Sequence, residues 1–310
     1  MQNTTSVPVF HFIQLSEDPD LQPVLSGLFL CMYILALFGN LLIILTVSSD
    51  SHLHTPMYFF LSNLSMVDIG FISTTVPRVI VDIQTHCPAI SYVGCLTQMS
   101  LFVIFACMDD MLLVVMAYDR FVAICHPLHY QVIMNPSRCG VLLLACFLLS
   151  LLELLLLYVA VLNFSNCEDY DYVEISNFFC GSSEVLKLAC FDTVISNIVR
   201  YCVGTVFGIL PISGIIFSYY KIVSSIMRSS SSSGKHKAFS TCGSHLSIVC
   251  LFYGTALGVY FSSSLSLSPK TNAVASVMYT VVTPMLNPFI YSLRNKDIKT
   301  ALRKILSRTF

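Results

Sequence analysis

The stretch LSGLFLCMYILALFGNLLIILTV, residues Leu25–Val47, contains no Asp, Glu, Lys or Arg. A helix that crosses a bilayer needs roughly 20 predominantly apolar residues, so this stretch is long enough to span one. Backbone groups in hydrocarbon must bond to one another, and a run of this length satisfies them as a helix rather than as a barrel strand. The sequence therefore predicts an all-α membrane protein, a bundle of seven transmembrane helices, because six further stretches are comparably long and apolar: Met57–Val76, Met99–Ala117, Cys139–Leu162, Tyr201–Tyr220, Leu246–Leu267 and Ala273–Leu293.

The composition agrees with this fold. Hydrophobic residues make up 55% of the chain and charged residues 11%, against about 25% charged residues in soluble domains. The spans and short loops take up the chain, so we expect a single domain, 1–310, with an N-terminal segment at 1–24. Met1–Gln22 lacks the basic and apolar regions of a cleaved signal peptide, so the first span is expected to target the chain.

The basic residues predict how the bundle lies in the membrane, because Lys and Arg near the ends of spans gather on the cytoplasmic side. With the N-terminus outside, all of the 16 Lys and Arg fall inside except Arg78, Lys187, Arg200 and Lys270. The opposite orientation reverses that ratio. We therefore expect a multi-pass protein with an extracellular N-terminus and a cytoplasmic C-terminus.

The tail at 294–310 follows the last span and has two kinds of residue on two faces. Basic residues alternate with an apolar stripe, which is typical of an amphipathic helix that lies on the anionic inner leaflet. A disordered basic tail would not need such a stripe. The apolar residues are Ile298, Leu302, Ile305 and Leu306, and the basic ones are Lys299, Arg303, Lys304 and Arg308.

Several motifs are more specific than this general pattern. They resemble those of the rhodopsin-like G-protein-coupled receptors and, very closely, those of the tetrapod-type olfactory receptors. The resemblance implies a receptor in the plasma membrane, not an enzyme, that binds a small volatile odorant and activates a stimulatory, olfactory-type G protein to raise cAMP. No nucleic-acid partner is expected. The segments are LHTPMYFFLSNL (Leu53–Leu64), MAYDRFVAICHPLHY (Met116–Tyr130), Ser218–Tyr219, KAFSTCGSHL (Lys237–Leu246) and PMLNPFIYSLRN (Pro284–Asn295).

The resemblance also assigns roles in activation. It implies that Arg120, which follows Asp119, is released on activation and meets the G protein. Tyr219 of the fifth span and Tyr291 of the seventh would then turn inward. Without the surrounding motif, an Arg that extends its charge to the membrane surface would be the simpler interpretation. Asn287 and Pro288 complete the matching motif of the seventh span.

Two acids are expected near the middle of the membrane, Asp68 and Asp109, with Asn287 beside them. Carboxyl groups inside a membrane are costly and usually functional. Two acids that face one cavity cannot both be bare anions, so one is protonated or they share a cation. The resemblance implies a Na⁺ ion at Asp68, with Asp109 as its neighbour. A network of hydrogen bonds without an ion is the alternative, and no other cofactor is expected.

The resemblance pairs the cysteines of the outer side. It implies one disulfide between Cys95 and Cys180 and a second between Cys167 and Cys190, which leaves Cys87 over. Asn3-Thr4-Thr5 is a glycosylation sequon on the same side of the membrane.

In the receptors that this sequence resembles, the ligand lies in the outer half of the bundle, between the third, fifth and sixth spans. Phe102 stands where amine receptors carry an acid, which favours a neutral ligand. Asp110 is on the same stripe and either forms a polar floor or joins the neighbouring acids. Plain helix packing is the alternative for many of the candidates, which are Phe102, Val103, Ala106, Cys107, Val203, Gly204, Phe207, Tyr253, Ala256, Leu257 and Tyr260.

The sequence disfavours two other classes of protein. A channel or transporter needs a polar path through the membrane, and Asp68, Asp109, Asp110 and Glu153 do not make one. Glu153 lies among leucines and is expected to face a neighbouring helix or to be protonated. An intramembrane hydrolase would need a Ser/His or paired-Asp motif, and the sequence has none of that kind.

Overall fold

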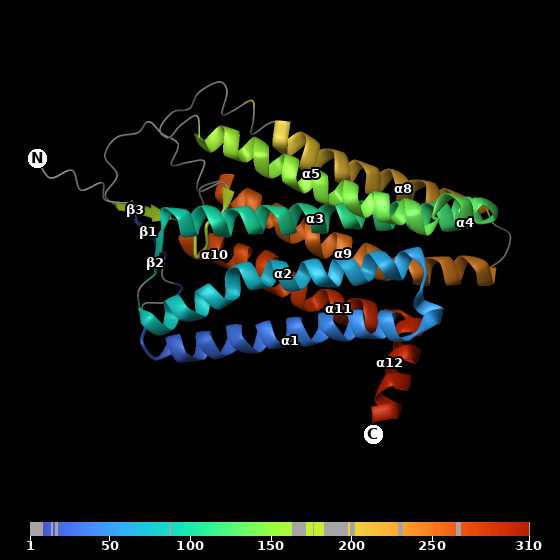
Figure 1. The fold of residues 1–310 in the computed structure, drawn as a ribbon, viewed down its shortest axis with the longest axis horizontal. Helices are drawn as coiled ribbons and strands as arrows, with labels where there is room; N and C mark the ends of the chain where they lie inside the picture. Colours follow the sequence, from blue (N-terminus) through green and yellow to red (C-terminus); the bar gives the residue numbers. More distant parts are fainter. Residues whose placement is uncertain are drawn as a thin grey trace, which may run out of the picture.

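The computed structural model describes residues 9–13, 15, 18–86, 88–162, 172–175, 177–182, 198, 202–228, 232–264 and 268–309. Long helices run side by side along the longest axis of the molecule (Figure 1). Seven helical segments in this part of the chain are long and apolar enough to cross a membrane, which confirms the predicted fold. The first four are formed by α1 (Leu21–Ser49), α2 (Pro56–Thr85), α3 (Tyr92–Cys125) and α5 (Pro136–Leu162).

The fifth and seventh spans are interrupted by wider turns. In the fifth, a π-helical turn at Thr205–Ile209 precedes α8 (Leu210–Arg228). In the seventh, α10 (Pro269–Val277) continues through a π-helical turn at Met278–Val282 into α11 (Thr283–Arg294). Each wide turn lies just before a proline, Pro211 or Pro284. Proline cannot donate a backbone hydrogen bond, so the preceding turn is free to widen. The sixth span is the regular helix α9 (Ser232–Ser264).

The tail forms the helix α12 (Lys296–Thr309), as predicted. It leaves the bundle at a steep angle to the long helices (Figure 1). Two contacts hold it against α1 and α2. The Tyr58 hydroxyl donates to Oδ2 of Asp297 at 3.0 Å, and Nζ of Lys304 lies 3.4 Å from Oδ2 of Asp50. Ile298 is buried on the inner face.

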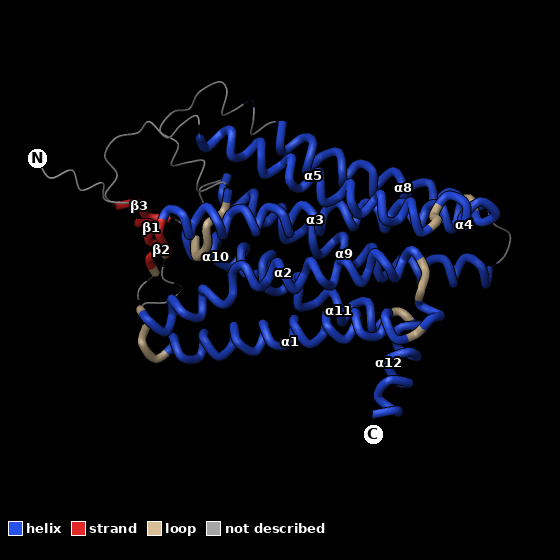
Figure 2. The backbone as a smooth tube through the Cα atoms, viewed as in Figure 1, coloured by secondary structure: helices blue, strands red, loops and turns tan. Residues whose placement is uncertain are grey.

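A small sheet caps one end of the bundle and was not predicted. Its strands are β1 (Val9–Phe12), β2 (Ala89–Ser91) and β3 (Tyr172–Ile175). β1 lies in the middle, antiparallel to β2 and parallel to β3. Figure 2 shows the strands only at this end, here named the sheet end. The short helix α4 (Tyr130–Ile133) marks the opposite end, here named the α4 end.

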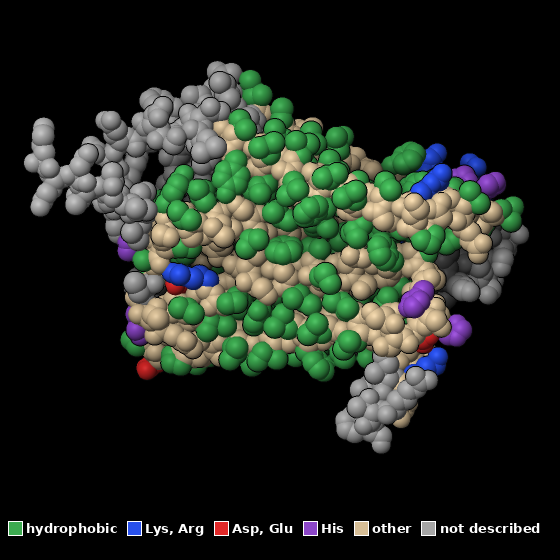
Figure 3. Space-filling model, in the orientation of Figure 1, with side chains coloured by type: hydrophobic (Ala, Val, Ile, Leu, Met, Phe, Trp, Pro, Cys, Tyr) green, Lys and Arg blue, Asp and Glu red, His purple; other side chains and the backbone are tan. Residues whose placement is uncertain are grey.

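The core lies inside the bundle and the outer face is apolar. Leu112, Leu113 and Met116 of α3 are almost completely buried. Large side chains on α1 and α5, such as Phe38 and Leu155, are exposed instead. Figure 3 shows hydrophobic side chains over the face that runs along the helices, with Lys and Arg near its two ends. An apolar surface of this extent is the surface of a protein that is solvated by lipid.

Candidate functional site

An ion pair lies at the α4 end of α3. Nη2 of Arg120 is 2.8 Å from Oδ2 of Asp119, and the Tyr130 hydroxyl donates to the other carboxylate oxygen at 2.8 Å. The Asp119 side chain is 0% exposed and the Arg120 side chain 15%. Burial and the adjacent Asp119 carboxylate raise the pKa of the Tyr130 phenol, so it stays protonated and donates. Both oxygens of Asp119 are therefore paired, and the charge of Arg120 is neutralised.

Tyr219 of α8 is held by a residue that the sequence did not single out. Its hydroxyl lies 2.6 Å from Nδ1 of His245 in α9, and the two rings are nearly parallel with centroids 5.8 Å apart. His245 is completely buried, and both residues are close enough to Arg120 to interact with its charge. His245 belongs to the KAFSTCGSHL segment, so that motif could have identified it as a candidate functional residue.

Tyr291 and Pro288 lie on the face of α11 that packs into the bundle. The Tyr291 hydroxyl points at Sδ of Met116, 3.9 Å away. Pro288 cannot donate to the carbonyl of Pro284, and Nδ2 of Asn40 in α1 donates to that carbonyl at 3.2 Å instead. Gly39 allows this close approach, because a Cβ at Gly39 would lie 2.8 Å from Cγ of Pro288.

Asp68, Asp109 and Asn287 come together as the sequence predicts. Nδ2 of Asn287 donates to both oxygens of Asp68, at 3.0 and 3.1 Å, and Asp109 is close enough to Asp68 to interact electrostatically. Oδ1 of Asp109 and Oδ1 of Asn287 are buried without a hydrogen-bond partner. Hard cations take oxygen ligands, so these atoms fit such an ion. Within the described residues, no group of three or more His, Cys, Asp or Glu could hold a metal, so side-chain amide or backbone oxygens would have to complete the shell.

Asp110 faces a different neighbour from Asp109. The Tyr253 hydroxyl of α9 donates to its Oδ1, while its Oδ2 is buried without a partner. One turn away on α3, Cys107 is close enough to Glu153 in α5 to interact with it electrostatically. Glu153 therefore faces a neighbouring helix, and Asp110 lies on the side of α3 that carries candidate ligand residues.

The other candidate ligand residues are placed unevenly. The Phe102 ring packs against Phe71, Phe179 and Tyr279, with centroids 5.0, 4.9 and 6.2 Å away. Val103 is buried. Ala106 and Ala256 are half-buried.

The remaining candidates lie on the fifth and sixth spans. Val203 and Gly204 lie just before the wide turn of the fifth span, and Phe207 is buried within it. Leu257 and Tyr260 are 46% and 66% exposed. The structure thus joins α3 to Tyr253 through Asp110 but leaves Leu257 and Tyr260 on the outer face of α9.

The sheet end is tied to α3 by the predicted disulfide between Cys95 and Cys180, which is present. Gln98 supports it, because its Oε1 accepts from the backbone nitrogen of Cys180 at 3.0 Å. The second predicted bridge, Cys167–Cys190, and the residues Cys87 and Asn3 lie outside the described residues.

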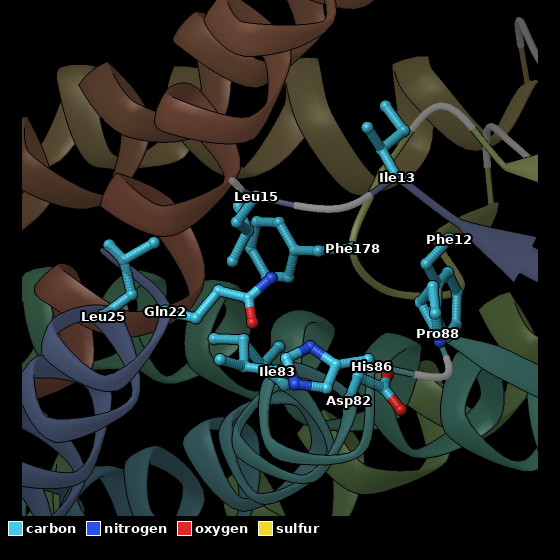
Figure 4. A pocket seen from close by; sticks show the side chains of 11 residues that line it. Phe12, Ile13, Leu15, Gln22, Leu25, Asp82, Ile83, His86, Pro88 and Phe178 are labelled. Atoms are coloured by element: carbon cyan, nitrogen blue, oxygen red, sulfur yellow. The ribbon is translucent and has the colours of Figure 1, made fainter. Parts of the chain in front are cut away.

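A hollow lies at the sheet end between the N-terminal segment, α1 and α2 (Figure 4). Phe12 and Phe178 line one side, and Gln22, Asp82 and His86 line another. Its cavity volume of about 30 Å³ is room for water rather than for an organic ligand. None of the candidate ligand residues lines it.

Seven spanning helices, an Asp-Arg pair at the end of the third and an Asn-Pro motif in the seventh define a seven-helix receptor of the rhodopsin type. The fold matches squid rhodopsin with a TM-score of 0.76, over 94% of this chain and 87% of that one, at 16% sequence identity. A family model described as olfactory receptor matches residues 29–309. The chain is 66% identical over 307 residues to human olfactory receptor 7E24, covering 99% of this chain and 90% of that protein. It is 65% identical over 308 residues to mouse olfactory receptor 7E178, covering 99% and 92%.

The chain therefore belongs to the olfactory receptor family. It is a seven-span membrane receptor and not an enzyme. Membership implies that it binds odorants and couples to a G protein, which confirms the class of function expected from its motifs.

Proposed function

We propose that this receptor lies in the plasma membrane with its sheet end outside and its α4 end inside. The charges support this orientation. In the described residues, Arg138, Lys221 and Arg228 lie at or near the α4 end, whereas Arg78 and Lys270 lie at the sheet end. Basic residues favour the cytoplasmic side. α12 then rests on the inner leaflet, where exposed Arg303 and Lys304 meet anionic lipid headgroups.

The ligand in this proposal is a small, neutral and mostly apolar volatile. The observation that carries it is the aromatic cluster of Phe71, Phe102, Phe179 and Tyr279 between the sheet end and the buried acids. A volatile that buries about 150–250 Å² of apolar surface against it gains about 4–6 kcal/mol before binding costs. The affinity is then micromolar or weaker. None of the described candidate ligand residues is basic, so an acidic ligand would bury its charge without a partner among them, at a cost of several kcal/mol.

The response in this proposal is activation of a stimulatory G protein and a rise in cAMP. In the resting receptor, Asp119 neutralises Arg120 and Tyr130 holds Asp119 in place. Activation separates Arg120 from Asp119 and presents the guanidinium to the G protein. Tyr219 and Tyr291, which lie on neighbouring helices, then turn toward the vacated space.

A Na⁺ ion between the acids belongs to the same proposal. Asp68, Asp109 and Asn287 would hold it, since they supply buried oxygens that include two without a partner. When bound, the ion supplies the positive charge that lets both carboxyl groups stay ionised.

The experiment is a panel of volatiles tested on cells that express the receptor and a cAMP reporter. We expect agonists among neutral alcohols, aldehydes, ketones and esters. The same cells without the stimulatory G protein should give no rise in cAMP. Agonists that are all permanently charged at neutral pH would contradict the ligand class, and a cAMP rise that persists without the G protein would contradict the coupling.

A further inference from the structure

Two polar pairs lie next to each other where α3 meets α5 and α9. Tyr253 of α9 donates to Oδ1 of Asp110, and Cys107 lies close enough to Glu153 of α5 to interact with it electrostatically. Asp110 interacts electrostatically with both Glu153 and Cys107, so the four side chains form one group, here named the polar floor. Cys107 and Tyr253 are among the candidate ligand residues.

The polar floor contains a hydrogen-bond acceptor to which no donor is bonded. Oδ2 of Asp110 is buried and has no hydrogen-bond partner, although the residue is only 5% exposed. A buried acceptor of this kind is costly to leave unpaired, and native structures usually pair it. In the described part of the chain, neither Asp110 nor Glu153 forms an ion pair. Oδ1 of the same carboxylate already accepts from Tyr253, so one further donor would pair both oxygens of Asp110.

The surroundings favour a donor that carries no charge. The Phe102 ring and its aromatic neighbours lie toward the sheet end from Asp110, where an apolar ligand body would pack. A hydroxyl group can donate to Oδ2 of Asp110 without bringing a charge out of water. A ketone, an ester or an ether offers only acceptors to this group and would leave the oxygen unpaired.

We propose that Asp110 is a specificity-determining residue that accepts a hydrogen bond from the hydroxyl group of the ligand, and that the neighbouring acid Glu153 strengthens this preference for a donor. The receptor thus selects alcohols over ethers and ketones of the same shape. This inference rests on the proposed function and makes its ligand class narrower. Tyr253 acts as a positioning residue, because it donates to Oδ1 of Asp110.

The first test uses pairs of an alcohol and its methyl ether across several chain lengths and rings, with the matching ketone and primary amine. The alcohol should activate the unmodified receptor at a concentration at least about tenfold lower than its ether. Equal potency of alcohol and ether overturns the inference and leaves the proposed function standing. Activation by the amine alone overturns it too, because an ionic pair would then replace the hydroxyl bond. Silence toward the whole panel counts against both proposals.

The second test uses Asp110→Asn, which keeps an oxygen for Tyr253 and puts an N–H donor where the unpaired oxygen was. The preference for alcohols should disappear, because the new N–H donates equally well to the oxygen of an alcohol, a ketone or an ether. Glu153→Gln should reduce the ratio of alcohol to ether potency by roughly 3- to 10-fold. Asp20→Asn is the matched control, since Asp20 is exposed and its side chain makes no capping bond.

The ratio of alcohol to ether potency within one variant does not depend on how much of that variant reaches the cell surface. It therefore separates recognition from folding. If Asp110→Asn does not reach the surface, the ratio of alcohol to ether potency in Glu153→Gln decides whether the inference holds. An unchanged ratio in every variant that reaches the surface overturns the inference.

Discussion

Three tyrosines near the α4 end each have a hydroxyl group with a different partner. Tyr130 donates to Asp119 at 2.8 Å, Tyr219 is bonded to His245 at 2.6 Å, and Tyr291 points at the sulfur of Met116. The first of these contacts stabilises the buried carboxylate beside Arg120. The second keeps Tyr219 turned toward α9. Single hydrogen bonds thus hold these side chains where they lie, and each bond can be removed by one substitution.

We expect His245→Phe to raise basal cAMP at equal surface expression. The phenyl ring fills the same space but cannot bond to the Tyr219 hydroxyl, which is buried and would be left unpaired at a cost of about 1–3 kcal/mol. The hydroxyl then gains by turning toward Arg120. His54→Phe, at an exposed position near the same end, is the control and should leave basal cAMP unchanged. Lower basal cAMP in His245→Phe would show that the pair does not hold the resting state.

The residues of this site were predicted to different degrees. Asp119, Arg120, Tyr219 and Tyr291 were found because they belong to sequence motifs. His245, the partner of Tyr219, was not predicted. Its side chain faces α8 only because of the way α9 is rotated about its axis. Apolar composition determines that a segment spans the membrane but not how it is rotated. For the same reason the sequence left both roles of Asp110 open.

The helices themselves were predicted from apolar length. Their irregularities follow from proline, because wide turns precede Pro211 and Pro284. The sheet was missed because its strands have only three or four residues and pair segments that are far apart in the sequence. Such short strands leave no recognisable alternation, so their pairing depends on the bundle that brings them together.

The contact of α1 with α11 depends on the absence of a side chain at Gly39. We expect Gly39→Ala to lower the apparent melting temperature of the detergent-solubilised receptor, at a cost of about 1–3 kcal/mol, because its Cβ would overlap Pro288. Gly27→Ala on the same helix is the control, since no atom lies within 4 Å of a Cβ there. It should be neutral or slightly stabilising, because Ala favours a helix over Gly. A drop of equal size in both variants would contradict the account, because a Cβ at Gly27 overlaps no atom.

The whole molecule places its two ends under different constraints. At the sheet end, the disulfide and the central strand β1 join α3 to the segments that cover the bundle. At the α4 end, the contacts are side-chain hydrogen bonds and ion pairs, and α12 is held by Tyr58 and Lys304. The sheet end, which carries the disulfide, is suited to keeping the shape of a binding site. The α4 end, which lacks such a link among the described residues, is suited to conformational change. The buried acids lie between the two ends.

The central claim is that a ligand bound near the sheet end acts on a G protein through Arg120. The most direct test is the odorant-evoked cAMP response of Arg120→Ala, compared with the unmodified receptor at equal surface expression. Lys270→Ala, an exposed basic residue at the opposite end, is the control. We expect Arg120→Ala to reach the surface and to lose the response, while Lys270→Ala keeps it. An unchanged response in Arg120→Ala would contradict the account.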